Sequence, residues 1–149
     1  MISPATIASV IFGICGMLAA AVLHYLLRAL ADDAGINRWI FISVPALLAM
    51  FFALLVYQEG QHRITRLSES ISRSILIALL TWGGFSALAS WAWCSARDFG
   101  QCLSRTLLAS AVVGGGPMLA AALLAGLVTG VIIMRPAAKP ENRSVDGFQ

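Results

Sequence analysis

The stretch Thr106–Met134, TLLASAVVGGGPMLAAALLAGLVTGVIIM, decides the class of this protein because it contains no acidic or basic side chain. A helix needs about 20 predominantly apolar residues to cross the hydrocarbon core of a bilayer, and this stretch exceeds that length. Three more uncharged stretches, Met1–Leu27, Trp39–Gln58 and Ser74–Ala96, are also long enough. The sequence therefore predicts an all-α membrane protein with four transmembrane helices in an antiparallel bundle.

The predicted spans leave little of the chain outside the membrane. We expect them at about 5–30, 38–58, 74–96 and 106–134, forming one transmembrane domain over residues 1–134. The first span is predicted to be retained rather than removed as a signal peptide. No Lys or Arg precedes its apolar run, and the run exceeds the roughly 7–15 residues of a signal-peptide core. Residues 135–149 are polar and are predicted to form a disordered tail.

Composition supports a membrane protein and argues against a nucleic-acid partner. Of the 149 residues, 59% are hydrophobic and 11% are charged, whereas soluble domains have about 25% charged residues. The formal net charge of +3 is small and is spread over several loops. Nucleic-acid binding needs a clustered basic face, so we expect the lipid bilayer, and no nucleic acid, around this chain.

The distribution of Lys and Arg favours one orientation in the membrane. With four spans, both termini and the middle loop share one side, which carries six positive side chains against four on the other. Cytoplasmic loops are enriched in Lys and Arg, so we expect both termini in the cytoplasm, with the protein in a bacterial inner membrane. The six are Arg63, Arg66, Arg73, Arg135, Lys139 and Arg143, and the four are Arg28, Arg38, Arg97 and Arg105.

Two cysteines lie at either end of the loop between the third and fourth spans. In the favoured orientation Cys94 and Cys102 face the periplasm, where disulfides form. A bridge between them would close a small loop and fix the positions of two helix ends. Two unpaired thiols at the membrane interface are the alternative. Cys15, in the middle of the first span, is expected to be a small packing residue.

Glycines predict a close contact between the third and fourth spans. Gly83 and Gly84 lie about ten residues into one span, and Gly114, Gly115 and Gly116 lie about ten residues into the other. At 1.5 Å per residue, both groups are about 15 Å deep, near the bilayer centre. We expect them to meet and to let the two backbones approach closely.

Pro117 follows the three glycines directly and allows two structures for the fourth span. A kinked but continuous helix is the common outcome in membranes. A broken helix is the other, and transporters place substrate sites at such breaks.

Two ridges of small residues repeat at every fourth position. Such ridges let helices pack closely, and they are either used inside the bundle or presented to another membrane protein. The ridge on the fourth span consists of Ala122, Gly126 and Gly130, and the ridge on the first span consists of Gly16, Ala20 and His24.

No catalytic residue, metal site or cofactor is predicted from the sequence. His24 lies inside a span and is expected to point into the bundle, where it either hydrogen-bonds a neighbouring helix or forms an intramembrane polar site. The only other histidine, His62, is in the middle loop. Zinc needs three or four grouped ligands, and the sequence has no such group and no C-x-x-C motif.

Two functions remain, and neither is enzymatic. In the first, the protein is an accessory subunit or immunity-type protein that acts through intramembrane helix contacts with another membrane protein. In the second, it carries a small solute along a path lined by His24 and the segment Gly114–Pro117, and a homo-oligomer is one arrangement that would form this path. Ion-coupled carriers and channels usually place charged groups inside the membrane, and the predicted spans have charged residues only at their ends, at Arg28 and Arg38, and none in their interiors.

Overall fold

The computed structural model describes residues 3–30, 37–59, 67–94 and 98–134 of the chain. They form four helices: α1 (Pro4–Leu30), α2 (Arg38–Glu59), α3 (Leu67–Trp93) and α4 (Phe99–Met134). All four are long and apolar enough to span a membrane. The predicted fold class, a bundle of four antiparallel transmembrane helices, is confirmed.

Polar side chains cap the starts of α1 and α2. The backbone N–H of Thr6 donates to Ser3 Oγ at 3.2 Å, and Pro4 takes the first helical position. The backbone N–H of Trp39 donates to Asn37 Oδ1 at 3.0 Å. Helix starts leave backbone donors without partners inside the helix, and Ser, Asn and an early proline suit these positions.

The helices α3 and α4 begin earlier than the uncharged stretches do. They start at Leu67 and Phe99 rather than at Ser74 and Thr106, because charged residues end the apolar stretch without ending the helix. In the first turns of α3, Arg73 Nη2 donates to Glu69 Oε1 at 2.6 Å, with the acid four residues before the base. Such pairs stabilise a helix by about 0.2–0.5 kcal/mol. The predicted tail, 135–149, lies outside the described residues.

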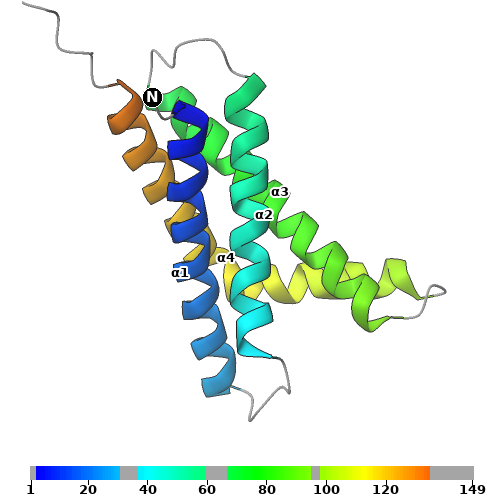
Figure 1. Ribbon diagram of the computed structural model, residues 1–149. Helices are drawn as coiled ribbons and strands as arrows, with labels where there is room; N and C mark the ends of the chain where they lie inside the picture. Colours follow the sequence, from blue (N-terminus) through cyan, green and yellow to red (C-terminus); the bar gives the residue numbers. More distant parts are fainter. Residues whose placement is uncertain (1–2, 31–36, 60–66, 95–97, 135–149) are drawn as a thin grey trace, which may run out of the picture.

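Each helix packs against two others, in a ring. The contacting pairs are α1 with α2, α2 with α3, α3 with α4, and α4 with α1, whereas the backbones of the diagonal pairs are not adjacent within the described residues. In Figure 1, α1 and α2 run side by side and α3 crosses behind them at an angle. The start of α1 and the end of α4 lie at the same end of the bundle.

The fourth helix is bent but continuous. In Figure 1 its first part, drawn in yellow, runs beside the second half of α3, and its orange part turns to follow α1. Pro117 lies inside this helix. Proline lacks an N–H and its ring crowds the carbonyl four residues earlier, so it bends helices. Of the two structures allowed by the sequence, the kinked helix is therefore the one observed.

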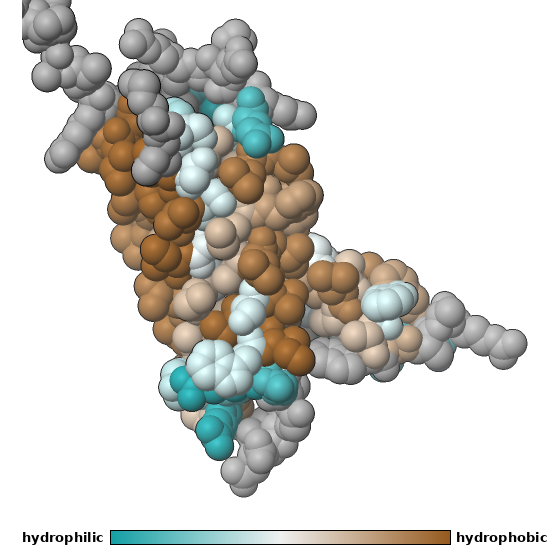
Figure 2. Space-filling view, viewed as in Figure 1, coloured by the Kyte–Doolittle hydropathy of each residue, from teal (hydrophilic) through white to brown (hydrophobic). Residues whose placement is uncertain are grey.

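The core is built from small side chains. Alanines dominate the central cluster, and Ile77 is the only large apolar side chain among those described as fully buried. Lipid is as apolar as a hydrophobic core, so close packing of small residues, rather than the exclusion of water, holds such helices together. Figure 2 shows a hydrophobic surface along the bundle, with hydrophilic residues at its ends. The cluster consists of Ala5, Ala8, Phe12, Ala49, Ala53, Tyr57, Ile77 and Ala125.

Candidate functional site

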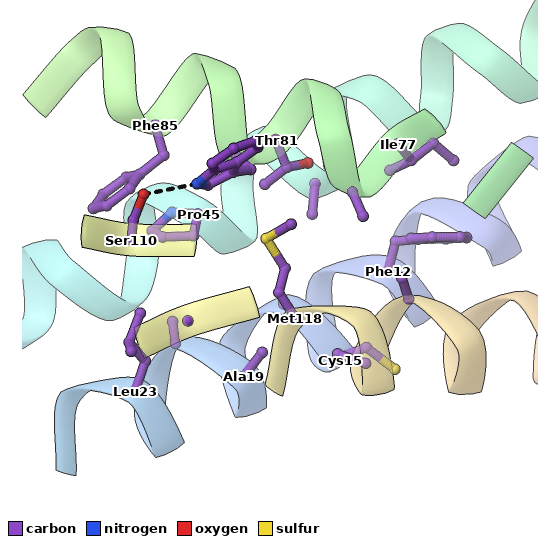
Figure 3. A pocket seen from close by; sticks show the side chains of 18 of the residues that line it. Phe12, Cys15, Ala19, Leu23, Pro45, Ile77, Thr81, Phe85, Ser110 and Met118 are labelled. Carbon is purple, nitrogen blue, oxygen red and sulfur yellow. Dashed lines mark hydrogen bonds between the residues drawn. The ribbon is translucent and has the colours of Figure 1, made fainter. Parts of the chain in front are cut away.

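A cavity of about 110 Å³ lies between the four helices. Every helix contributes to its wall, and Figure 3 shows Met118 of α4 pointing from one side of it toward α3 on the other. The cavity is partly open, so a molecule dissolved in the bilayer need not unfold the bundle to enter. The wall consists of Phe12, Cys15, Gly16, Ala19, Ala20, Leu23, Phe41, Pro45, Ala49, Ile77, Ala78, Thr81, Trp82, Phe85, Ser110, Gly114, Met118, Ala121 and Ala122.

The wall is almost entirely apolar, with few polar groups. Trp82 Nε1 donates to Ser110 Oγ at 2.8 Å, a hydrogen bond that joins α3 to α4 (Figure 3). Ser110 in turn donates to the carbonyl of Leu107 at 3.1 Å. The Thr81 hydroxyl oxygen is buried and has no hydrogen-bond partner among the described residues. Cys15 is the only ionisable side chain on this wall.

A proline on α2 lies on the wall, and a proline on α4 lies beside it. Pro45 of α2 lines the cavity. Pro117 of α4 lies in the sequence between Gly114 and Met118, which both line the cavity. Each proline removes one helical N–H. Both helices therefore lack one backbone hydrogen-bond donor close to the cavity.

Aromatic rings close one side of the cavity. Phe41 and Phe85, both on the wall, meet edge to face with their ring centroids 5.7 Å apart. The His24 ring lies 5.8 Å from that of Phe41. His24 is half-buried, and the contacts described for it are with the rings of Phe41 and Tyr25. His24 is therefore a neighbour of the aromatic pair and is not one of the residues that form the cavity wall.

The ridge on α1 is used inside the bundle. A side chain at Gly16 would bring a Cβ within 3.3 Å of the Ala49 Cβ and 3.5 Å of the Ala46 Cα, both on α2. Gly16 and Ala20 also line the cavity. This ridge therefore packs α1 against α2 and does not present itself to another protein.

The ridge on α4 is also internal. Gly126 and Gly130 are buried against α3, where a Cβ at either position would collide with the side chains of Ser70, Ser74 or Leu67. Ser70 Oγ donates to the Gly126 carbonyl at 2.8 Å. Ala122, one turn earlier, lines the cavity. Of the two uses that the sequence left open for this ridge, packing inside the bundle is the one that fits, because Gly126 and Gly130 are covered by α3.

The glycines in the middle of α3 and α4 do not meet. Gly84 faces Phe52 and Leu48 of α2, and Gly114 faces Leu23 of α1. A Cβ added at any other glycine of this set would have nothing within 4 Å. The bend in α4 and the crossing of α3 turn these positions toward different neighbours, which depth alone does not reveal. The glycines with this open space are Gly83, Gly115 and Gly116.

A disulfide joins the ends of α3 and α4. Cys94 and Cys102 are paired, with their Cα atoms 6.5 Å apart. Of the two alternatives that the sequence allowed, a disulfide or two unpaired thiols, the disulfide is therefore the one found. Cys15 is unpaired and half-buried.

A cluster of polar groups lies near the start of α3. The Arg73 guanidinium lies 5.8 Å from the centre of the Tyr57 ring, and only 18% of the Arg73 side chain is exposed. Arg73 Nη1 is enclosed and has no hydrogen-bond partner in the part of the chain that the structure describes, and the Ser70 side chain lies close to the Tyr57 hydroxyl. An arginine above an aromatic face is stabilised by the ring's electrons. This cluster anchors the end of the bundle where Glu69 supplies a counter-charge.

The cavity includes residues that the sequence did not single out. Thr81, Trp82, Ser110 and Met118 were not expected at a site, although the first three are polar residues inside uncharged spans. The presence of a polar side chain inside an uncharged span was the only sequence signal that pointed to these three residues. No protein-family model, curated protein or solved structure matches this chain. The fold and the cavity together define a multi-pass helical membrane protein with an internal apolar site.

Proposed function

We propose that this protein binds a small, uncharged and mostly apolar solute inside the membrane, and that it acts as a carrier or reservoir for it without catalysing a reaction. The observation that carries this proposal is the cavity of about 110 Å³ walled by all four helices. Its lack of charged side chains suits an uncharged solute, because burying an unpaired charge is very unfavourable.

An unfilled cavity of this size is unfavourable in itself. Protein interiors are close-packed, with few voids larger than a water molecule. An enclosed cavity of about 110 Å³ would be penalised by about 2–3 kcal/mol at roughly 24 cal/mol per Å³, and this value is an upper limit here because the cavity is partly open. Dry apolar cavities of comparable size bind benzene or xenon. A solute that fills the space recovers the lost contacts, which supports binding as the role of this space.

The other function, contact with a second membrane protein, remains a prediction with less support. Its two candidate surfaces were the ridges on α1 and α4, and both are occupied by neighbouring helices. Contacts between membrane helices need small residues that allow close approach, and the small residues of these two ridges are already used inside the bundle. The bacterial inner membrane and the cytoplasmic placement of both termini also remain part of the proposal.

The first test fills the cavity from its wall. Ala122 is buried and lines the cavity, so Ala122→Leu should occupy the space. Benzene added to the detergent-solubilised protein should shift the Met118 methyl NMR signal saturably in the unsubstituted protein. It should not do so in Ala122→Leu. The methyl signal of Met17, which is 50% exposed, reports non-specific detergent effects.

The matched control is Ala120→Leu on the same helix. Ala120 is exposed and is not on the cavity wall, so this variant should bind benzene as the unsubstituted protein does. Circular dichroism establishes that both variants keep their helices. An unsubstituted protein whose Met118 signal ignores benzene, or an Ala122→Leu variant that still responds, would contradict the proposed function.

A further inference from the structure

Aromatic rings gather around the cavity in a bundle that is otherwise packed by small side chains. Alanine supplies most of the buried apolar residues described. Phe12 and Phe41 are the two phenylalanines buried among the described residues, and both line the cavity. Trp82 and Phe85 of α3 are the other two rings on the wall. The rings are therefore concentrated around the space that a solute would fill.

The hydroxyl and indole groups of the wall are occupied or buried. The Trp82 indole N–H donates to Ser110 Oγ, and the Ser110 hydroxyl donates to the Leu107 carbonyl. The Thr81 hydroxyl oxygen is buried. A molecule in the cavity therefore meets mainly aromatic and aliphatic carbon, together with the side chain of Met118.

The wall provides two kinds of contact that favour an aromatic guest. Aromatic rings prefer edge-to-face or offset contacts with other rings, as Phe41 and Phe85 already show with their centroids 5.7 Å apart. Met118 points across the space toward α3, the helix that carries Phe85 (Figure 3), and a thioether sulfur contacts aromatic rings favourably. A flat unsaturated ring in the cavity would have both kinds of neighbour.

The surrounding lipid offers neither kind of contact. Lipid tails are as apolar as a leucine side chain, so a saturated solute finds similar neighbours in the bilayer and in the cavity. Acyl chains carry no aromatic ring and no sulfur atom. An aromatic solute therefore gains contacts in the cavity that the bilayer does not supply.

We infer that the cavity selects neutral molecules that carry a single aromatic ring over saturated molecules of similar size, and that Phe85 contributes to this selection. This inference rests on the proposed function and adds the chemical class of the solute to it. The size follows from the cavity of about 110 Å³, which is slightly smaller than an engineered cavity of about 150 Å³ that accepts benzene.

The experiment compares benzene with cyclohexane. Benzene binding is followed by the Met118 methyl NMR signal of the detergent-solubilised protein, and cyclohexane binding is measured by its reversal of the benzene-induced shift. Both affinities are corrected for partition into the detergent. The unsubstituted protein should bind benzene about twofold to tenfold more tightly than cyclohexane, as expected for favourable ring contacts.

Two variants separate the effect of the ring from the effect of cavity size. Phe85 is half-buried on the wall, and Phe85→Leu removes its ring, so the preference for benzene should shrink. Leu23→Val, the matched control, enlarges the same cavity without removing a ring and should keep the preference. Circular dichroism establishes that both variants keep their helices.

The possible failures of this inference and of the proposed function are distinguishable. An unsubstituted protein that binds the two compounds equally overturns the aromatic selection and leaves the proposed function intact. The same holds for a helical Phe85→Leu variant with an unchanged preference, or for a preference that shrinks equally in Leu23→Val. An unsubstituted protein that binds neither compound overturns both. The comparison in the unsubstituted protein decides the preference even where a variant loses its helices.

Discussion

Gly126 and Gly116 lie on the same helix, yet their surroundings differ completely. Gly126 is covered by Ser70 and Ser74, and a Cβ there would collide with the Ser74 side chain. Gly116 is exposed and a Cβ there would meet nothing within 4 Å. The first glycine is required for close approach of two helices, and the second is not.

We expect Gly126→Ala to lower the free energy of unfolding by about 1–3 kcal/mol, because extra bulk in a packed interface forces its neighbours to move. Gly116→Ala, the matched control, should change it by no more than about 0.5 kcal/mol, as exposed positions usually do. Unfolding in a detergent titration followed by circular dichroism measures both. Equal effects from the two substitutions would show that α3 does not cover Gly126 as described.

The sequence identified which residues are small but not which of them pack. Gly16, Gly126 and Gly130 are enclosed by neighbouring helices, whereas Gly83 and Gly116 have open space beside them. A repeat of four positions places residues on one face of a helix, but it does not say which neighbour that face meets.

At the scale of elements, the bend in α4 determines where its two halves run. The first half lies beside α3 and the second half follows α1 (Figure 1). The sequence allowed both a kink and a break near Pro117, because the outcome depends on what the neighbouring helices contact. The four helices themselves were predictable, since length and lack of charge settle a transmembrane span. The early starts of α3 and α4 were not, because charge marks the edge of the lipid and not the end of a helix.

We expect Pro117→Ala to straighten α4, because alanine restores the missing N–H and removes the ring from the preceding turn. Spin labels at Ser104 and Val131, both exposed, would then move apart by several ångströms, toward the roughly 40 Å of a straight helix. Pulsed electron resonance measures this distance after Cys15 is replaced by alanine.

Pro45→Ala with the same two labels is the control, since Pro45 lies on α2. It should leave the distance within α4 unchanged. A Pro117→Ala protein with the distance of the unsubstituted protein would assign the bend to packing against α1 and α3, and not to the proline.

At the scale of the whole molecule, the positive side chains and the disulfide favour the same orientation in the membrane. The four helices place the start of α1 and the end of α4 at the same end of the bundle (Figure 1). The ratio of six to four positive side chains favours that end in the cytoplasm. The disulfide between Cys94 and Cys102 fits the opposite side of the membrane, where thiols are oxidised.

We therefore expect a reporter that works only in the cytoplasm to be active when it is fused after Gln149. A reporter that works only in the periplasm should be inactive at the same position. In the same cells, thiol reagents should label Cys94 and Cys102 only after a reductant is added. A periplasmic signal from the fusion would invert the orientation, and full labelling of both cysteines before reduction would exclude the bridge in the cell.

Met118 gives the cavity a wall that can change its shape. Its side chain points across the space toward α3 (Figure 3), and an unbranched thioether has three rotatable bonds and a polarizable sulfur. Different rotamers of this one residue enlarge or reduce the room available without moving any helix. A site with an adjustable wall tolerates solutes of several outlines, so its tolerance is broad for shape and narrow for polarity. We expect the natural solutes to be a chemically related group rather than a single compound.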